Sequence, residues 1–152
     1  MSYNILIKDL TSKLSQKVIG TDKGLAKIGD SIVNFVYSVA KSIYLTKNSS
    51  NNKIIRTGKK VSKMILSVAL KDAKLKPYAK TRADAHDLAD TAEALIAYIW
   101  LSGNMNMDAM IRIMVENFSG NLNVRAEEIQ NATIAFTQLL ESIKIYLPKP
   151  KL

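Results

Sequence analysis

The stretch from Leu88 to Gly103 is almost entirely apolar, yet it carries two carboxylates, those of Asp90 and Glu93. Its apolar residues fit a helix, on which residues three positions apart are neighbours with Cβ atoms about 5–6 Å apart. Carboxylates are seldom kept on such a face without a partner. Because two like charges this close repel unless a cation lies between them, the stretch predicts a helix that holds a divalent metal ion.

The same stretch resembles the second acidic motif of the ribonuclease III endonuclease domain. That motif has the pattern Asp-x-x-Glu-Ala-Leu-Ile-Gly-Ala-x-Tyr-Leu-x-Gly-Gly, and Asp90 and Glu93 match its two carboxylates. Upstream, residues 25–33 read Leu-Ala-Lys-Ile-Gly-Asp-Ser-Ile-Val and resemble the family signature Leu-Glu-Phe-Leu-Gly-Asp-Ser-Val-Leu. The two motifs occur in the expected order and together span most of the domain, so the chain as a whole is similar to this family.

This resemblance implies a hydrolytic site built from three carboxylates. It identifies Asp30, Asp90 and Glu93 as catalytic residues and as ligands of Mg²⁺ or Mn²⁺. Hard oxygen ligands suit these ions, which generate hydroxide and neutralise charge on a phosphodiester. Family members dimerise through the helix that bears the signature, and two-fold symmetry then matches the two strands of an RNA duplex. The expected protein is therefore a metal-dependent endoribonuclease that cleaves double-stranded RNA as a homodimer.

Two positions depart from the family pattern. Ala26 and Lys23 stand where the family has glutamates, although mini-ribonuclease III proteins also have an apolar residue at the Ala26 position. Asp22 could substitute as a ligand, although it lies at a predicted helix start. His86 could orient Asp90 from the same helix face, although such a histidine is more often structural. The lost carboxylate predicts weaker or substrate-assisted metal binding, or a degenerate enzyme.

The net charge of +9 is unevenly distributed along the chain. Residues 1–82 contain 17 of the 22 Lys and Arg but only 4 of the 13 Asp and Glu, whereas residues 83–152 carry more acid than base. A basic surface beside an acidic helix suits a protein that binds a polyanion with lysines and a metal ion with carboxylates. The alternative is a solvated, lysine-rich surface. The residues expected to contact RNA phosphates are Lys23, Lys27, Lys47, Lys53, Arg56, Lys59, Lys60 and Lys63.

The length of 152 residues predicts one domain, residues 1–152, with a single core and no room for a following double-stranded-RNA-binding domain. The chain has no cysteine, which excludes disulfides and zinc–thiolate sites. The N-terminus does not resemble a signal peptide, and the apolar stretches 32–44 and 92–101 are shorter than the ~20 residues that span a bilayer. We therefore expect a cytoplasmic protein without membrane partners.

Apolar residues recur at helical spacing throughout the chain, without strand alternation. The predicted fold is all-α, with about six helices at residues 3–18, 24–45, 59–76, 82–102, 106–117 and 124–147. Thr81 is the predicted N-cap of the fourth helix, and the acid-free segment 46–58 is predicted to be a mobile basic loop. Lysines at the start of the third helix oppose its dipole, which suggests that they face an anion. Tyr98 and Trp100 are expected to make core or dimer contacts.

Two other functions remain open from the sequence. The same fold could be a non-enzymatic RNA-binding dimer whose cluster no longer holds metal, a reading that Ala26 and Lys23 favour. Alternatively, the chain could be a helical adaptor whose acids are merely solvated; its partner binding would be independent of salt, and it would have no affinity for RNA. Incubation with labelled duplex RNA, with Mn²⁺ or with chelator, would separate the three.

Overall fold

The computed structural model describes residues 2–11 and 16–148, and about 70% of these residues are helical, with no strands among them. The all-α prediction is confirmed. The α-helices are α1 (Lys8–Thr11), α2 (Gln16–Gly20), α3 (Lys23–Lys47), α4 (Lys63–Asp72), α5 (Ala85–Leu101), α6 (Met107–Asn117) and α7 (Arg125–Ile143). Short 3₁₀ helices occur at Asn4–Leu6, Lys76–Tyr78 and Lys144–Tyr146. No helix within the described ranges is long and apolar enough to cross a membrane.

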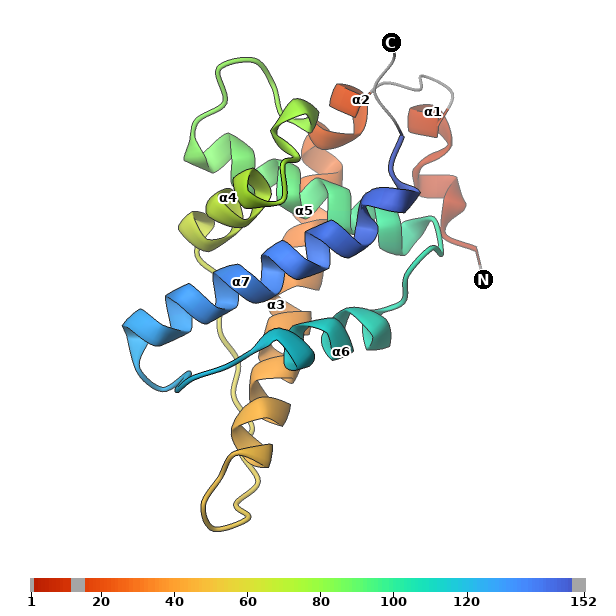
Figure 1. Cartoon of the computed structure of the whole chain (residues 1–152). Helices are drawn as coiled ribbons and strands as arrows, with labels where there is room; N and C mark the ends of the chain where they lie inside the picture. Colours follow the sequence, from red (N-terminus) through yellow and green to blue (C-terminus); the bar gives the residue numbers. More distant parts are fainter. Residues whose placement is uncertain (1, 12–15, 149–152) are drawn as a thin grey trace.

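Helix α5 lies in the centre of the molecule (Figure 1). It packs against α3 on one side and α4 on another, while α7 covers α4 and α6, and α6 packs on α3. Every residue of α5 from Thr91 to Ile99 is buried. A helix that is apolar on all sides can be stable only inside a core. The polar side chains that α5 does carry, above all Glu93, are therefore held where water does not reach them.

Side-chain caps determine where the central helices begin. Asp22 accepts a hydrogen bond from the Leu25 amide at the start of α3, and Ser62 caps α4 in the same way. Helix α5 begins with a capping box in which Asp84 and Asp87 each accept the other's backbone amide. The prediction that Thr81 caps this helix is wrong by three residues. Asp84 has the more effective position because its carboxylate, unlike the expected hydroxyl, reaches the third helical amide.

The N-terminal segment differs from the single helix predicted for residues 3–18. The structure has a 3₁₀ turn at Asn4–Leu6, then α1 and α2, and residues 12–15 lie outside the described part. The chain is not helical at Ile7, which is buried in the core. Tyr3 stacks on Trp100 with ring centroids 4.7 Å apart, so Trp100 has a partner within its own chain. Burial of Ile7 and this stacking therefore accompany the break in the helix.

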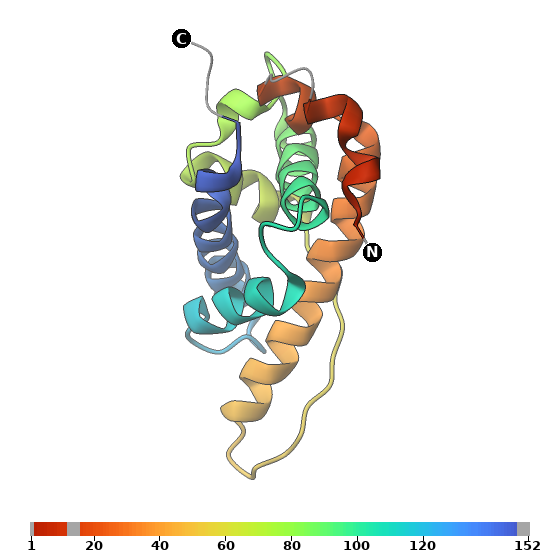
Figure 2. The same cartoon turned by 90° about the vertical axis from the view of Figure 1, so that its right-hand side faces the viewer.

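The C-terminal end of α3 projects beyond the other helices, and the following segment runs back alongside it (Figure 2). Residues 54–61 of this segment, here called the strap, are extended rather than helical. The hydroxyls of Ser38, Ser42 and Thr46 each contact the backbone of one strap residue. The strap is thus pinned to α3, so the prediction of a mobile loop is wrong for residues 54–58 and the prediction of a helix is wrong for residues 59–61. The third helix also begins later than expected, at Lys63.

Candidate active site

The closest approach of α3 to α5 is made possible by Gly29. A Cβ atom at this position would lie 1.9 Å from the carbonyl oxygen of Glu93, a distance that no side chain tolerates. The glycine therefore lets the two backbones touch. The next residue along α3 is Asp30, so the same contact brings Asp30 beside Glu93. The Gly-Asp order of the first motif thus has a packing reason as well as a chemical one.

The three predicted carboxylates line one pocket of about 400 Å³. We call Asp30, Asp90 and Glu93 the carboxylate cluster. Their side chains differ in exposure, at 38% for Asp30, 17% for Asp90 and 2% for Glu93. The remaining residues that line the pocket are Lys23, Ala26, Lys27, Lys63 and His86. The two motifs, far apart in sequence, therefore meet at one site.

Lysine ammonium groups accompany every carboxylate of the cluster. Lys63 Nζ lies between two of them, 3.1 Å from Asp90 Oδ1 and 3.3 Å from Glu93 Oε1. Lys23 Nζ lies 3.5 Å from Asp90 Oδ2, and Lys60 Nζ lies 3.2 Å from Asp30 Oδ1. Three lysines predicted to bind phosphate therefore form ion pairs inside the site. Their charges balance the cluster.

The pKa values of Asp30 and Glu93 move in opposite directions. Burial and, second, its hydrogen bond with Asp30 raise the pKa of Glu93 to about 7, against the opposing charge of Lys63. The same hydrogen bond lowers the pKa of Asp30, with help from Lys60. Near neutral pH the pair therefore holds one proton, on Glu93, for part of the time. Two carboxyls in this state lack a shared cation.

His86 and Asp22, the further residues considered for the site, line two different pockets. His86 Nδ1 lies 3.4 Å from Asp90 Oδ2, and its side chain is 67% exposed, so it is placed to orient Asp90 from the rim. Asp22 lines a smaller neighbouring pocket that also includes Asp90, but its carboxylate already caps α3. Ala26 faces the carboxylate pocket without a polar group. Among the described residues, the pocket therefore has three carboxylates, with none from the position of Ala26.

The family model for ribonuclease III matches residues 23–148, which include α3 to α7 and both motifs. The chain belongs to the ribonuclease III family. A search of curated proteins found no match. Membership supports an RNA-processing nuclease fold, and it covers the elements that supply every residue of the carboxylate cluster.

The donor set of this ribonuclease III domain has the chemistry of a divalent-metal site. All three cluster side chains offer carboxylate oxygens, the ligands that Mg²⁺ prefers, and the partly protonated Glu93 would be held ionised by a cation. The arrangement is nevertheless more open than a closed metal cage. Within residues 2–11 and 16–148, no group of three or more acidic or histidine side chains is close enough to hold a metal ion. Lysines occupy the intervening positions.

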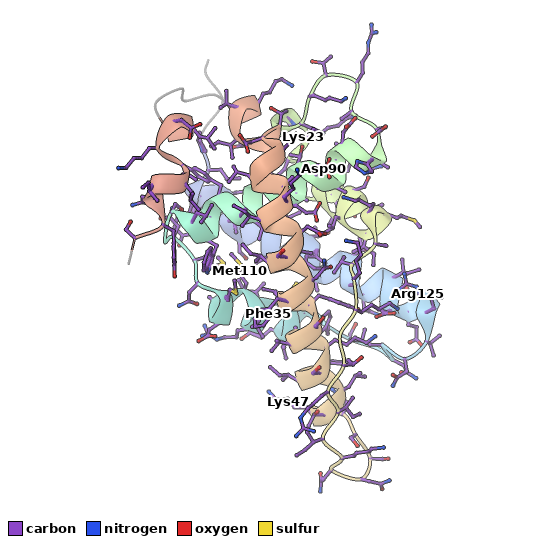
Figure 3. All side chains as sticks on the ribbon, turned by 180° about the vertical axis from the view of Figure 1, so that it is seen from behind. Lys23, Phe35, Lys47, Asp90, Met110 and Arg125 are labelled. Atoms are coloured by element: carbon purple, nitrogen blue, oxygen red, sulfur yellow. The ribbon has the colours of Figure 1, made fainter. Side chains whose placement is uncertain are left out.

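The other predicted phosphate ligands of the ribonuclease III domain do not form one patch. Figure 3 shows Lys23 beside Asp90 near one end of α3 and Lys47 near the other end. Lys27, Lys47, Lys53 and Arg56 have exposed side chains. Lys59 instead points inward to a second cluster, described next. The structure thus spreads the basic residues along α3 and the non-helical segment that follows it.

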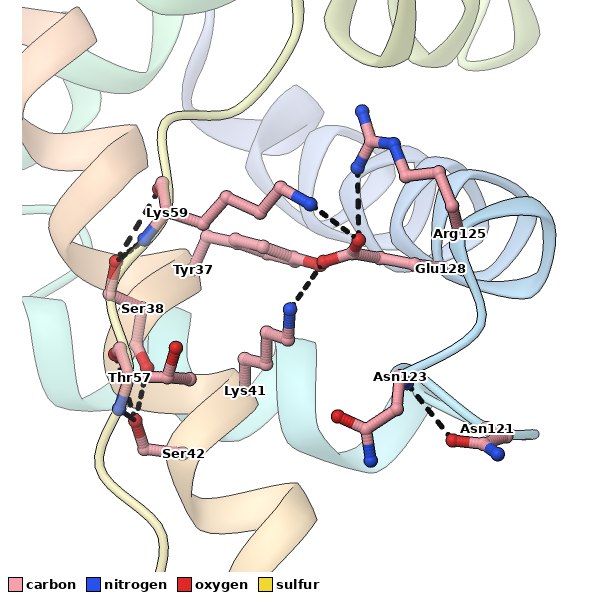
Figure 4. Close-up of polar contacts among 10 residues, drawn as sticks. All are labelled: Tyr37, Ser38, Lys41, Ser42, Thr57, Lys59, Asn121, Asn123, Arg125 and Glu128. Carbon is pink, nitrogen blue, oxygen red and sulfur yellow. Dashed lines mark hydrogen bonds and ion pairs between the residues drawn. The ribbon is translucent and has the colours of Figure 1, made fainter.

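Sequence reasoning missed a buried carboxylate on α7. Glu128 accepts hydrogen bonds from Lys41 Nζ at 2.6 Å, Tyr37 Oη at 2.7 Å, Lys59 Nζ at 2.8 Å and Arg125 Nη1 at 2.9 Å (Figure 4). We call these five residues the Glu128 cluster. It joins α3, the strap and α7. Its only local sequence signal is the pair Arg125 and Glu128, which is indistinguishable from an ordinary surface pair on a helix.

The donors around Glu128 overcome the cost of its burial. Burial raises the pKa of Glu128, but the hydrogen bonds from Lys41, Lys59 and Tyr37 together lower it to about 2. Burial and the neighbouring Glu128 carboxylate raise the pKa of Tyr37 well above its usual range. Both groups therefore keep one charge state at every physiological pH. The Glu128 cluster consequently serves as a brace rather than as a site for proton transfer.

Proposed function

We propose that this ribonuclease III domain is a divalent-metal-dependent endoribonuclease that cleaves double-stranded RNA as a homodimer. The observation that carries the proposal is the meeting of Asp30, Asp90 and Glu93 in one pocket within a ribonuclease III fold. Two neighbouring carboxyls that share a proton at neutral pH are a poor resting arrangement, and such groups are common at functional sites.

The chemistry assigns a task to each residue of the cluster. A bound Mg²⁺ or Mn²⁺ ion would supply a hydroxide nucleophile and neutralise charge on the phosphate. Asp90 and Glu93, on one face of α5, would hold the ion together with Asp30 from α3. His86 would keep Asp90 in its ligand orientation through the 3.4 Å contact. Glu93 would hold its proton toward Asp30 until the ion replaces it.

Exposed basic side chains support RNA as the substrate. Lys27 lines the carboxylate pocket, and Lys53 and Arg56 are exposed on the segment that runs beside α3. These residues would contact phosphates, whereas A-form shape rather than base identity would select a duplex. Most of the binding free energy would then come from counterion release and would fall steeply with salt.

An exposed apolar face of α3 supports the homodimer. Phe35 is 54% exposed, and a groove of about 400 Å³ beside it is lined by Val39 and Ile43 from α3 and by Ile111 and Val115 from α6. A second copy of the chain would bury this face. The dimer would have a mass of about 34 kDa, twice the 16.9 kDa of the chain, and sedimentation as a strict monomer would exclude it.

The second candidate is an RNA-binding dimer without catalytic activity. It is favoured by Ala26, which leaves the pocket without a further carboxylate, and by Lys23, which pairs with Asp90 where the family has an acid. The two proposals agree on RNA and on the dimer. They differ only in whether a divalent ion can enter the carboxylate cluster.

The deciding experiment is incubation of labelled duplex RNA with wild-type protein and with Asp90→Asn, in Mn²⁺ and in chelator. We expect wild-type cleavage only with Mn²⁺, and a loss of at least about a thousandfold in the variant, which still binds RNA. Asp72→Asn, an exposed carboxylate at the end of α4, is the control. Undiminished cleavage by Asp90→Asn would remove Asp90 from the site, and RNA binding without cleavage in any metal would establish the second candidate.

A further inference from the structure

Lys63 occupies an unusual position at the start of a helix. It is the first residue of α4, where a positive charge opposes the helix dipole and should cost some stability. Its side chain nevertheless reaches across to α5 and places Nζ between Asp90 and Glu93. The local helix does not account for this lysine, but the two carboxylates do.

The ammonium group sits where a shared cation is needed. Asp90 and Glu93 are one turn apart on α5, and their like charges require a positive charge between them. Burial lowers the pKa of Lys63, but the hydrogen bond that Lys63 donates to Asp90 and the charge of Glu93 outweigh this and raise it above its usual value. Lys63 is therefore a permanent cation at this position.

We propose that Lys63 is a resident counter-ion of the carboxylate cluster, and that a divalent ion binds only by displacing its ammonium group from Asp90 and Glu93. The inference rests on the proposed function, because it concerns the ion that the nuclease would use. Metal binding is then an exchange of one cation for another. The protein's own lysine sets the metal concentration at which the site fills.

The geometry permits such an exchange. The Lys63 side chain is 40% exposed and makes two contacts longer than 3.0 Å, so it can move outward by rotation of its flexible stem. The pocket beside it has about 400 Å³ of space, partly because Ala26 is small. Two cations cannot both remain between the same carboxylates, since they repel at this distance. The ion and the ammonium group are therefore alternatives.

The other two lysines compete less effectively. Lys23 lies 3.5 Å from Asp90 with a side chain that is 75% exposed, and Lys60 is 68% exposed at Asp30. Exposed pairs of this kind contribute little free energy. Each of these lysines also contacts one carboxylate rather than bridging two. Of the three lysines, Lys63 is therefore the one whose substitution should change metal affinity the most.

The test measures binding of Mn²⁺ alone, from the electron paramagnetic resonance signal of the free ion, without RNA. Lys63→Gln should bind Mn²⁺ about tenfold more tightly than wild type, because the ion no longer displaces an ammonium group. Lys63→Arg keeps the charge and should not bind more tightly. Lys71→Gln, in the last turn of α4, removes an exposed lysine outside the pocket and should match wild type.

Thermal unfolding provides a second measurement. In chelator, Lys63→Gln should melt below wild type because Asp90 and Glu93 are left without their cation, and Mn²⁺ should raise its melting temperature more than that of wild type. Equal Mn²⁺ affinity in wild type and Lys63→Gln, or weaker binding by the variant, would overturn the exchange while leaving the proposed nuclease intact. No Mn²⁺ binding by either protein at millimolar concentration would overturn both.

Discussion

Glu93 and Glu128 are buried to the same extent, with 1% and 2% of their surface exposed, yet they have opposite properties. The pKa of Glu93 is raised to about 7, whereas that of Glu128 is lowered to about 2. Burial alone would raise both. The difference shows that the partners of a buried carboxylate, rather than its depth, determine its charge.

The partners differ in number and in sign. Glu128 receives four hydrogen bonds, three of them from cations, so both of its oxygens are satisfied. Glu93 has one ammonium group, which it shares with Asp90, and a second acid, Asp30, as its neighbour. One glutamate is therefore fixed as an anion. Glu93 has too little positive charge around it to stay fully ionised, and a bound metal ion would supply that charge.

Replacement of Glu93 or Glu128 by glutamine should reveal the largest difference in stability between the carboxylate cluster and the Glu128 cluster. Glu128→Gln leaves Lys41, Lys59 and Arg125 without their counter-ion, and we expect a loss of about 3–5 kcal/mol in the free energy of unfolding. Urea denaturation at pH 7 measures this. The control is Glu141→Gln in the exposed pair with Lys144, which should change stability by less than about 0.5 kcal/mol.

Glu93→Gln is the matched substitution in the other cluster. It resembles the protonated form that Glu93 partly adopts at neutral pH, so its cost should be small at pH 7 and should become a gain at pH 8. A loss as large as that of Glu128→Gln would contradict the contrast between the two glutamates.

The pH dependence of stability should also differ in sign. The folded pKa of Glu93 lies above its ordinary value of 4.5, so its contribution is complete below pH 4.5 and is lost as the pH rises toward 7. The folded pKa of Glu128 is lowered, so its contribution is complete above pH 4.5 and is lost as the pH falls toward 2. Each effect should amount to about 3 kcal/mol.

Thermal or urea unfolding between pH 2 and 8 tests these two slopes. Glu93→Gln should remove the decline on the alkaline side and leave the acid side unchanged. Glu128→Gln should do the reverse. The comparison fails if both variants alter the same side of the profile.

Substitution of Gly29 should disturb the carboxylate cluster but not the Glu128 cluster. Gly29→Ala places a methyl group 1.9 Å from the Glu93 carbonyl oxygen, so α3 and α5 must separate at an estimated cost of about 1–3 kcal/mol. Asp30 then moves away from Glu93, and the pKa of Glu93 should fall toward its ordinary value. Stability measured against pH reports both changes. An alkaline slope identical to that of wild type would show that Asp30 does not affect Glu93.

The smallest effect should come from the strap, which connects the clusters through the adjacent residues Lys59 and Lys60. Successive side chains of an extended segment point in opposite directions, which sends Lys59 to Glu128 and Lys60 to Asp30. Ser42→Ala removes both contacts to Thr57 and should cost about 1 kcal/mol. A double-mutant cycle with Glu128→Gln measures whether the contact between Ser42 and Thr57 stabilises the Glu128 cluster.

Local patterns were sufficient to predict the helices and the meeting of the two motifs. Helical periodicity placed α3, α5 and α6 within about three residues, and the family resemblance brought Asp30 and Glu93 together before any packing was known. Their metal-binding and catalytic roles stay predictions. The predicted cap of α5 is wrong by three residues because Thr81 and Asp84 are both of a type that caps helices, and the reciprocal contact between Asp84 and Asp87 favours the later position.

Contacts between distant residues could not be predicted in this way. Glu128 meets Tyr37 and Lys41 from the other end of the chain, and nothing near Glu128 in sequence indicates a buried acid. The polar composition of residues 46–58 predicts a mobile loop, although the strap begins at residue 54. Its order comes from hydroxyls on α3, which a composition argument does not include. Lys63 was assigned to phosphate for the same reason: its anion lies on another helix.

The three hydroxyl contacts between α3 and the strap depend on two repeats of nearly equal length. Ser38, Ser42 and Thr46 are four helical residues apart, about 6.0 Å, whereas their partners Lys59, Thr57 and Ile55 are two extended residues apart, about 6.6 Å. The two repeats therefore drift by roughly 0.6 Å with each contact. Ser42 contacts both polar backbone atoms of Thr57 within 3.0 Å, and Thr46 contacts those of Ile55 within 3.1 Å. The Ser38 hydroxyl lies 3.0 Å from the Lys59 amide nitrogen and 3.5 Å from its carbonyl oxygen. The mismatch is small enough for three consecutive hydroxyls of α3 to contact alternate residues of the strap.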